Sequence, residues 1–268
     1  TDASGNYSFN RVHLGSYKVE VVPGNVTLNG DTVALSDYTQ TLAYGSSASR
    51  TDAGKGKLTT PTAITLTAAA PTASKIDFGF VKPASIGDYV WFDANKNGIQ
   101  DADEYSVAGV RVTLVDSLGN PVVDANGNTV AAVTTDANGK YIFENLLPNP
   151  ERMLAQNGND SYTVRFTPPA GYTGTTSNAG TDADTDSNGP TPKVTLAEGQ
   201  KDMSIDFGLI SNGYIGDTIF WDVDNNGGSA PSGADKPLAG VTVTLTFTTP
   251  AGVEKTLTTT TDANGKYK

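Results

Sequence analysis

Oxygen-bearing side chains recur at regular spacing in the segment Asp-Ala-Asn-Lys-Asn-Gly-Ile-Gln-Asp-Ala-Asp-Glu, residues 93–104. Carboxylate or amide side chains occupy positions 1, 3, 5, 9 and 12 of this segment, and glycine occupies position 6. A calcium loop of the EF-hand kind uses this spacing, because a hard cation takes six to eight oxygen ligands and the glycine allows the sharp turn. The segment therefore predicts a calcium site. Its expected ligands are Asp93, Asn95, Asn97, the carbonyl of Ile99, Asp101 and Glu104.

A second acidic cluster lies at residues 181–189, where carboxylates and an amide alternate with other residues. In an extended chain alternate side chains point to the same side, and carboxylates so close together repel one another unless a cation lies between them. The cluster is interpreted either as a second calcium site or as a solvated acidic loop. The candidate ligands are Asp182, Asp184, Asp186 and Asn188.

A third candidate begins with Asp222, Asp224, Asn226 and a glycine, which repeats the first half of the central loop. The sequence then departs from the pattern with a Gly-Ser-Ala-Pro insertion, and the acid closest to the last ligand position is Asp235. We expect calcium to bind here with altered geometry. Residues 50–57, which match the second cluster in an earlier copy of the unit, carry Arg and Lys, so no site is expected there.

The elements that must position the central loop are β-strands. Residues 86–92 are aromatic and β-branched, which is typical of a strand. Val110, Val112 and Leu114 alternate with polar side chains, which is the pattern of a strand with one buried face. A loop between two strands has no helices to open, so we expect a structural ion and not a calcium-triggered switch.

The composition favours an all-β protein with many turns. Only 37% of the 268 residues are hydrophobic, and the formal net charge is -11. Such a surface repels nucleic acid and anionic lipid and attracts divalent cations. The chain has no cysteine, so another device, such as bound metal, must stiffen small domains. No apolar run approaches the ~20 residues of a membrane span. Because residue 1 is Thr, we expect an internal piece of a longer protein.

One sequence unit recurs along the chain. The Thr-Asp-Ala motif at Thr135 is found again at Thr1 and at Thr261, and the Ile-Asp-Phe-Gly motif at Ile76 is found again at Ile205. These matches predict a repeat with a period of about 130 residues. The predicted division is the second half of a repeat over residues 1–83, a complete repeat over 84–211 and the first half of the next repeat over 212–268.

The complete repeat contains about seven short, alternating segments, which predicts an immunoglobulin-like β-sandwich. Asn138-Gly139 predicts a two-residue hairpin, because both positions of that turn need positive φ. Asp136 and Asn138 are interpreted as turn formers and Asp206 as facing outward or toward a neighbouring loop. The expected strands are 86–92, 108–116, 129–135, 140–144, 161–167, 193–197 and 203–209.

These motifs together resemble the B-type repeats of serine-aspartate-repeat bacterial surface adhesins, the SdrD-B family, which is also similar to Cna-B-type domains. The likeness covers the complete unit and both partial ones. It implies tandem β-sandwich repeats that bind several Ca²⁺ ions and serve as a stalk on a cell-wall-attached or secreted protein. The motifs that carry it are Ile86 to Asp93, the loop to Glu104, Val107 to Val110, Thr135 to Tyr141 and Ile205 to Gly208.

The leading functional hypothesis is a structural stalk or spacer of a surface adhesin, rigidified by calcium, whose partners are neighbouring repeats. An alternative follows from the two partial repeats: copies of the chain join head to tail by strand complementation into an extracellular filament. A third alternative is an accessory module of a secreted enzyme. The chain itself has no nucleophile motif or histidine partner for its acids, so it is not expected to be an enzyme, and the adhesin's own ligand is expected to bind another region.

Overall fold

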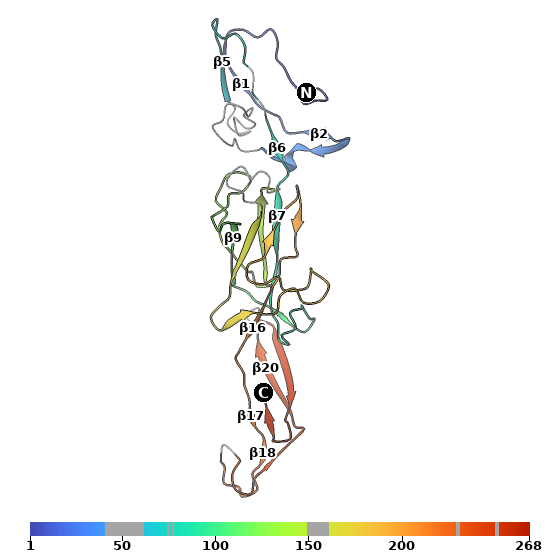
Figure 1. The fold of residues 1–268 in the computed structure, drawn as a ribbon, viewed down its shortest axis with the longest axis vertical. Coiled ribbons are helices and arrows are strands. Elements are labelled where there is room, and N and C mark those ends of the chain that lie inside the picture. The colour runs from blue at the N-terminus through green and yellow to red at the C-terminus, as the bar shows by residue number, and fades with distance from the viewer. Residues whose placement is uncertain (41–61, 74–75, 77, 149–160, 229–230, 250–251) are drawn as a thin grey trace.

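The computed structural model describes residues 1–40, 62–73, 76, 78–148, 161–228, 231–249 and 252–268. The molecule is elongated, with the N-terminal strands at one end, two facing sheets in the middle and the C-terminal strands at the other end (Figure 1). No helix in these residues is long and apolar enough to cross a membrane.

The central region, which starts at β7, consists of two sheets that face one another. One sheet has the order β11-β7-β16-β13, with β8 and β15 also paired to β7, and the other has the order β10-β9-β12-β14. The strands of the first sheet are β7 (Ala84–Phe92), β8 (Tyr105–Ser106), β11 (Lys140–Leu146), β13 (Tyr172–Gly174), β15 (Lys201–Asp202) and β16 (Phe207–Ser211). Those of the second are β9 (Arg111–Asp116), β10 (Val133–Thr134), β12 (Tyr162–Thr167) and β14 (Lys193–Val194).

The core lies between these sheets, because alternate residues of each strand point inward. On β9, Val112 and Leu114 are buried whereas Arg111 is exposed. The rings of Phe166 and Phe207 stack across the sheets with centroids 4.7 Å apart. Each fully buried side chain of this kind stabilises the fold by about 1.5–3 kcal/mol.

Strand β7 is covered on both faces, which explains why its sequence is apolar almost throughout. Ile86 and Val90 are buried, and so is Trp91, their neighbour on the opposite face. A Cβ atom at Gly208 would lie 2.5 Å from Thr175 and 2.7 Å from the Trp91 ring, so the sheet and the loop around Thr175 enclose this indole. The face of β7 that carries Trp91 is therefore covered by the loop around Thr175.

The two end regions contain small two-stranded sheets. At the N-terminal end the pairs are β1 (Gly15–Val19) with β5 (Thr62–Leu66), β2 (Asn25–Leu28) with β3 (Asp31–Ala34), and β4 (Thr39–Gln40) with β6 (Phe80–Val81), with a 3-10 turn, η1, at Leu35–Asp37. At the C-terminal end the pairs are β17 (Asp217–Thr218) with β22 (Lys266–Tyr267), β18 (Phe220–Trp221) with β19 (Lys236–Pro237), and β20 (Thr242–Thr248) with β21 (Glu254–Thr260).

The all-β sandwich fold is confirmed, and the expected strands lie close to those observed. The predicted Asn138-Gly139 hairpin is wrong, because β10 and β11 on either side of it belong to different sheets. Gly139 has a φ of 73°, but Asn138 does not have positive φ. The reason is Asp136, whose Oδ1 accepts the N–H groups of Asn138 and Lys140 at 2.8 and 2.9 Å and forms a four-residue turn with Gly139 last. The division at 83/84 and 211/212 stays a prediction.

Candidate metal centres

Asp93 organises the central loop from its buried position at the end of β7. Its Oδ1 accepts the N–H groups of Lys96 and Asn97 at 2.6 and 3.2 Å. Its Oδ2 accepts the N–H of Gly98 at 2.8 Å and the hydroxyl of Thr175 at 2.5 Å. One carboxylate thus folds the first half of the loop and ties it to Thr175, the residue that directly follows β13.

Glu104 closes the loop from its other end. Its Oε1 accepts the N–H of Ala94 at 2.7 Å and its Oε2 accepts that of Asp101 at 3.2 Å. The side-chain amides of Asn95 and Asn97 donate to the Asp101 carboxylate at 2.7 and 2.8 Å. The loop is therefore held together by side chains of five of the six predicted ligands and by the N–H of Ile99, which donates to Asn97 Oδ1 at 2.8 Å.

Burial makes this loop costly when its carboxylates are charged. Desolvation raises the pKa of Glu104, and the negative charge of Asp93 raises it further. Gly98 is required at the bend, since its φ is 81° and a Cβ there would lie 2.5 Å from the carbonyl oxygen of Thr176. A cation in the loop would offset both the desolvation and the repulsion.

The second acidic cluster lies directly on the first loop. The N–H of Gln100 donates to the Thr185 carbonyl at 2.8 Å, and the N–H of Ser187 donates to the Gly98 carbonyl at 3.0 Å. Ile99, the remaining predicted ligand, forms a β-bridge with Asp186. The two clusters are thus hydrogen-bonded to each other, although residues 105–180 lie between them along the chain.

The predicted alternation of Asp182, Asp184 and Asp186 along an extended chain is wrong. The N–H of Asp184 donates to the Asp182 carboxylate at 3.1 Å, and the N–H of Thr185 donates to the Asp182 carbonyl at 3.3 Å, so the segment turns. Asp182 and Asp184 are exposed, whereas Asp186 is buried. The Oδ1 atom of Asp186 is buried without a hydrogen-bond partner, and burial followed by the charge of Asp182 raises its pKa.

Asp206 joins this cluster, and the sequence did not single it out as a ligand. It is fully buried, its Oδ1 accepts the N–H of Tyr89 at 3.0 Å, and its own N–H donates to Asn188 Oδ1 at 2.5 Å. Its Oδ2 has no hydrogen-bond partner. Burial, and then the charge of Asp88, raises the pKa of Asp206 to about 8. Of the two predicted orientations of Asp206, outward or toward a neighbouring loop, the structure has the second.

The recurrence of Asp within the Ile-Asp-Phe-Gly motif was the available signal for Asp206. A carboxylate between buried apolar residues needs a hydrogen-bond or ionic partner. Because the Asp recurs in both copies of the motif, it indicates that each repeat provides such a partner. Asp77, which stands at the same place in the first copy of the motif, lies outside the described residues, as do residues 50–57, where no site was expected.

The third loop reproduces the hydrogen bonds of the central loop despite its insertion. Asp222 accepts the N–H of Gly227 at 3.1 Å, as Asp93 accepts that of Gly98. Asp235 accepts the N–H of Val223 at 2.9 Å and so takes the place of Glu104. The predicted correspondence of these acids therefore holds in the structure.

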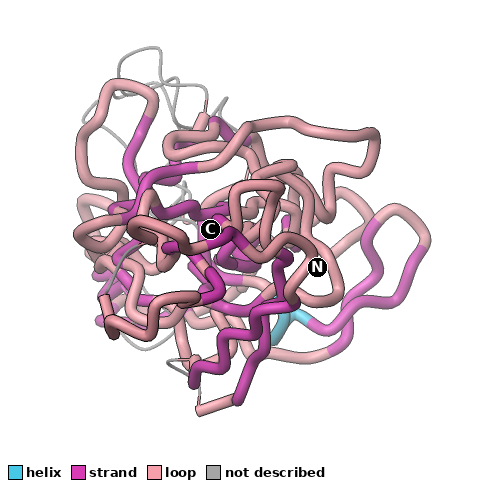
Figure 2. Tube along the Cα trace, turned by 90° about the horizontal axis from the view of Figure 1, so that it is seen from below, coloured by secondary structure: helices cyan, strands magenta, loops and turns pink. Residues whose placement is uncertain are grey.

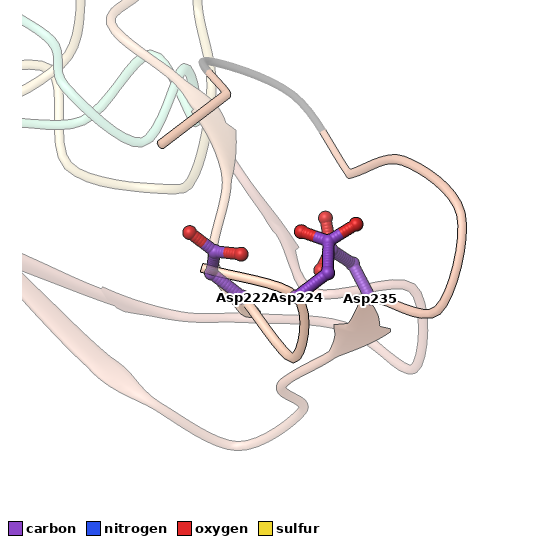
Figure 3. Close-up of side chains that lie close together, drawn as sticks. All are labelled: Asp222, Asp224 and Asp235. Carbon is purple, nitrogen blue, oxygen red and sulfur yellow. The ribbon is translucent and has the colours of Figure 1, made fainter. Parts of the chain in front are cut away.

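The two loops distribute their acids differently. Asn226 donates its amide to the hydroxyl of Ser232 at 3.0 Å, where Asn97 donates to Asp101. Ser232 thus occupies the position of Asp101, which removes one acid from the third loop. Asp224 occupies the position of Asn95, which restores the number of acids. Carboxylate oxygens of Asp222, Asp224 and Asp235 lie within 4.8 Å of one another (Figure 3), the one group of three or more such ligands that meets this limit in the described part of the chain.

Burial of the first acid separates the two loops, since Asp93 is fully buried whereas its counterpart Asp222 is only partly buried. Backbone N–H groups, that of Gly227 first, lower the pKa of Asp222, whereas burial raises the pKa values of Glu104 and Asp206. The donor sets consist of carboxylate, amide and hydroxyl oxygens, which fit a hard cation such as Ca²⁺ and do not fit a soft metal.

Fold and loops together define a protein of β-sandwich repeats with acid-rich loops between the strands. Residues 84–209 match the family model for the SdrD B-like domain. The chain therefore carries an SdrD-B-type repeat, and the predicted family is confirmed.

Two relatives show how this chain compares with longer proteins. Serine-aspartate repeat-containing protein F of Staphylococcus epidermidis is 34% identical over 272 residues, which cover 100% of this chain and 14% of that protein. Serine-aspartate repeat-containing protein D of Staphylococcus aureus (strain Newman) is 42% identical over 194 residues, which cover 72% of this chain and 13% of that protein. The chain thus spans about one seventh of the length of these relatives.

Two solved structures share the β-rich architecture at low similarity. The Streptococcal ancillary pilin has 15% identity and a TM-score of 0.32, over 86% of this chain and 61% of that one. The shaft pilin SpaA of Lactobacillus rhamnosus GG has 14% identity and a TM-score of 0.27, over 69% of this chain and 80% of that one. The relatives assign the chain to the bacterial cell surface, as a structural module of the adhesin type.

Proposed function

We propose that the chain is a stalk segment of a bacterial surface adhesin, and that Ca²⁺ bound in the interstrand loops rigidifies it. The observation that carries the proposal is the pair of docked acidic loops, in which Asp186 and Asp206 each bury a carboxylate oxygen that has no hydrogen-bond partner. A buried, unpaired carboxylate is among the least favourable groups in a folded protein. A divalent cation supplies the missing partner.

The chain's own residues would hold the ion in defined roles. Asp93 and Glu104 fix the two ends of the central loop, and Asn95, Asn97 and Asp101 provide oxygen donors between them. Residues 182–188 and Asp206 supply further oxygens from the second cluster, and Asp222, Asp224 and Asp235 supply those of the third loop. In this function the acids are structural ligands and the chain catalyses no reaction.

The central loop also lies at a junction, which links ion binding to stiffness of the rod. The Lys255 ammonium donates to the carbonyl of Asp103 at 3.2 Å, and the rings of Tyr105 and Phe247 pack edge to face with centroids 5.7 Å apart. Residues inside and directly after the loop therefore contact the C-terminal region. An ion that orders the loop would also fix this contact.

The junction at the other end of the central region is apolar. Val81, Ala125 and Leu147 form a small buried cluster there, and Thr39 donates to the side chain of Asn145 at 3.5 Å. Contacts of this kind at both ends favour a semi-rigid rod over independent beads. A stiff spacer holds a terminal ligand-binding region away from the cell wall.

The test is calcium-dependent stability, followed through tryptophan fluorescence. Trp91 is fully buried beside the loops and Trp221 is 61% exposed, so a Trp221→Phe background reports on the central region alone. We expect Ca²⁺ to raise the free energy of unfolding by about 2.7 kcal/mol per site at a hundred times the Kd. For an extracellular module that Kd is roughly 0.1–1 mM.

Matched variants show whether the gain comes from the loops. Glu104→Gln keeps the shape of the side chain and removes one charge, so it should lose much of the calcium response, whereas Glu198→Gln, outside the loops, should keep it. Equal urea midpoints and equal proteolysis rates in Ca²⁺ and in EDTA for the parent protein would refute the proposal.

A further inference from the structure

Five residues from three distant segments of the central repeat form a closed hydrogen-bond ring: Asp93, Gly98, Thr175, Ser187 and Gly208. The N–H of Gly98 and the hydroxyl of Thr175 both donate to Asp93 Oδ2, at 2.8 and 2.5 Å. The N–H of Thr175 donates to the Gly208 carbonyl at 2.9 Å, and the N–H of Gly208 donates to Ser187 Oγ at 3.1 Å. The N–H of Ser187 donates to the Gly98 carbonyl at 3.0 Å and closes the ring.

The hydrogen-bond ring is largely buried, so water competes little for its bonds. Asp93 and Ser187 are fully buried, and Gly98 and Gly208 are buried as well. A hydrogen bond in such surroundings is stronger than one at the surface, and a buried donor or acceptor that loses its partner costs free energy. The ring therefore holds the Asp93 carboxylate in one orientation.

Gly208 lets the ring close, which gives the glycine of the Ile-Asp-Phe-Gly motif a role. Its φ is not positive, so its backbone conformation does not require glycine. Space does require it, since a Cβ there would lie 2.5 Å from the Thr175 methyl group and 2.7 Å from the Trp91 indole. The missing side chain is what allows Thr175 to approach β16 and reach Asp93.

Thr175 and Ser187 belong to the segment that joins β13 to β14, residues 175–192, which is loop, as is much of the molecule (Figure 2). Hydrogen bonds and one β-bridge hold this segment against the central loop. The Ser187 carbonyl also accepts the N–H of Asn178 at 2.7 Å, which folds the segment back on itself and fixes Ser187. Neither hydroxyl residue was among the predicted ligands.

We propose that Thr175 and Ser187 are positioning residues for the ion of the central loop, and that they set the affinity of the loop for Ca²⁺. Thr175 orients the Asp93 carboxylate, and Ser187 joins the bend at Gly98 to the backbone of β16. Groups that bond to metal ligands fix the orientation of those ligands, so both residues act through the ring and neither is assigned as a ligand. The inference rests on the calcium binding proposed above and names two residues that regulate it.

The hydrogen-bond ring links the order of the central loop to the order of residues 175–192. If the closed ring binds the ion more tightly than an open one, the ion favours the closed ring to the same extent, because coupling between two equilibria is reciprocal. We therefore expect Ca²⁺ to slow amide exchange at Gly208, which lies outside every predicted ligand set and whose N–H donates to Ser187.

The calcium affinity of matched variants tests the proposal, in the Trp221→Phe background that leaves Trp91 as the reporter. Thr175→Val keeps the size of the side chain but removes the hydroxyl donor, so the Kd should rise about 10- to 100-fold. Thr175→Ser keeps the hydroxyl and should restore most of the affinity, and Thr173→Val, exposed on β13, should leave the Kd unchanged. Urea unfolding at a series of free Ca²⁺ concentrations gives the Kd, because the free energy of unfolding rises only once Ca²⁺ exceeds it.

Amide exchange in EDTA provides a readout that needs no ion. Thr175→Val opens the ring, so exchange at Gly98 and Ser187 should become faster, while exchange at Val112 in the core strand β9 should stay slow. Ser187→Ala removes the acceptor of the Gly208 N–H and should also raise the Kd, so it tests the proposal if Thr175→Val does not fold. A residue with a purely structural role would instead lower the urea midpoint equally with and without Ca²⁺.

Three outcomes distinguish the possibilities. A Kd that rises in Thr175→Val and returns in Thr175→Ser supports the inference. A calcium-responsive parent whose Kd is unchanged in Thr175→Val and in Ser187→Ala overturns the positioning role and leaves the calcium stalk intact. A parent whose stability does not respond to Ca²⁺ refutes the proposed function, and this inference with it.

Discussion

Replacing Asp206 by Asn tests the idea that its carboxylate awaits a cation. The side chain is fully buried, and its pKa is raised to about 8 by burial and by the charge of Asp88. In the unfolded chain an Asp has a pKa of about 3.9. Without metal, the folded state therefore holds a proton that the unfolded state has released at every pH between these two values.

The sign and size of the effect follow from that difference. Because the folded state binds more protons, the free energy of unfolding falls as the pH rises from about 4 to about 8. Each pH unit in this window costs about 1.4 kcal/mol, so the change between pH 5 and pH 7 is about 2.7 kcal/mol for this group alone. Asp206→Asn carries no titrating proton and should lose this slope. The variant therefore gains about 2.7 kcal/mol relative to the parent over the same interval.

Urea unfolding in EDTA, followed by Trp91 fluorescence at several pH values, measures this difference. Glu104 and Asp186, whose pKa values are also raised, contribute the same pH dependence of the free energy of unfolding in parent and variant. Their contributions therefore cancel in the comparison. In excess Ca²⁺ the order should reverse above pH 7, because only the parent has the carboxylate that a cation requires. Parallel pH profiles for parent and variant in EDTA would refute the assignment of Asp206 as a buried, uncompensated acid.

Three further changes probe the fold around the loops, each read from urea unfolding through Trp91. Thr135→Val leaves the buried carbonyl and N–H that this hydroxyl serves without partners and should cost about 2–4 kcal/mol, whereas Thr134→Val on the exposed side should cost less than about 0.5 kcal/mol. Gly87→Ala places a Cβ 2.4 Å from the Tyr141 carbonyl oxygen and should cost more than about 2 kcal/mol; an unchanged midpoint would mean that β7 and β11 are further apart than described. Glu104→Gln in EDTA removes the titrating group and should reduce the fall in the free energy of unfolding with rising pH, while an unchanged pH profile would contradict the raised pKa of Glu104.

Much of the fold could be predicted from sequence because its signals are local. Alternation on residues 110–115 gave the buried face of β9, and the repeated motifs gave the correspondence between β7 and β17. The Asp-x-x-Gly turns follow the same logic, since Asp116, Asp124 and Asp136 each accept two N–H groups of their own turn. One residue type and its neighbours suffice to specify such a turn.

The features that could not be predicted depend on contacts between distant segments. The predicted hairpin at Asn138-Gly139 is wrong because the strands on either side of it belong to different sheets. Pairing of β10 with β9 and of β11 with β7 decides this, and the turn residues do not. The docking of residues 181–189 on the central loop, and the burial of Asp206 beneath them, likewise have no local signal. The second cluster turns where alternation predicted extension, because backbone and side-chain bonds to Asp182 outweigh a simple strand pattern.

The central and the third loop place their carboxylates in different surroundings. Both loops have nearly the same hydrogen bonds and the same number of acids at the corresponding ligand positions, yet burial raises the pKa of Glu104 while backbone N–H groups lower that of Asp222. Without an ion the central carboxylates are therefore strained by their surroundings, and those of the third loop are already satisfied. An ion consequently has more to offset in the central loop, and calcium should stabilise the central region more than the C-terminal one. Comparing Glu104→Gln with Asp235→Asn decides this: an equal loss of calcium-dependent stability from the two variants would show that the number of acids, and not their burial, sets the response.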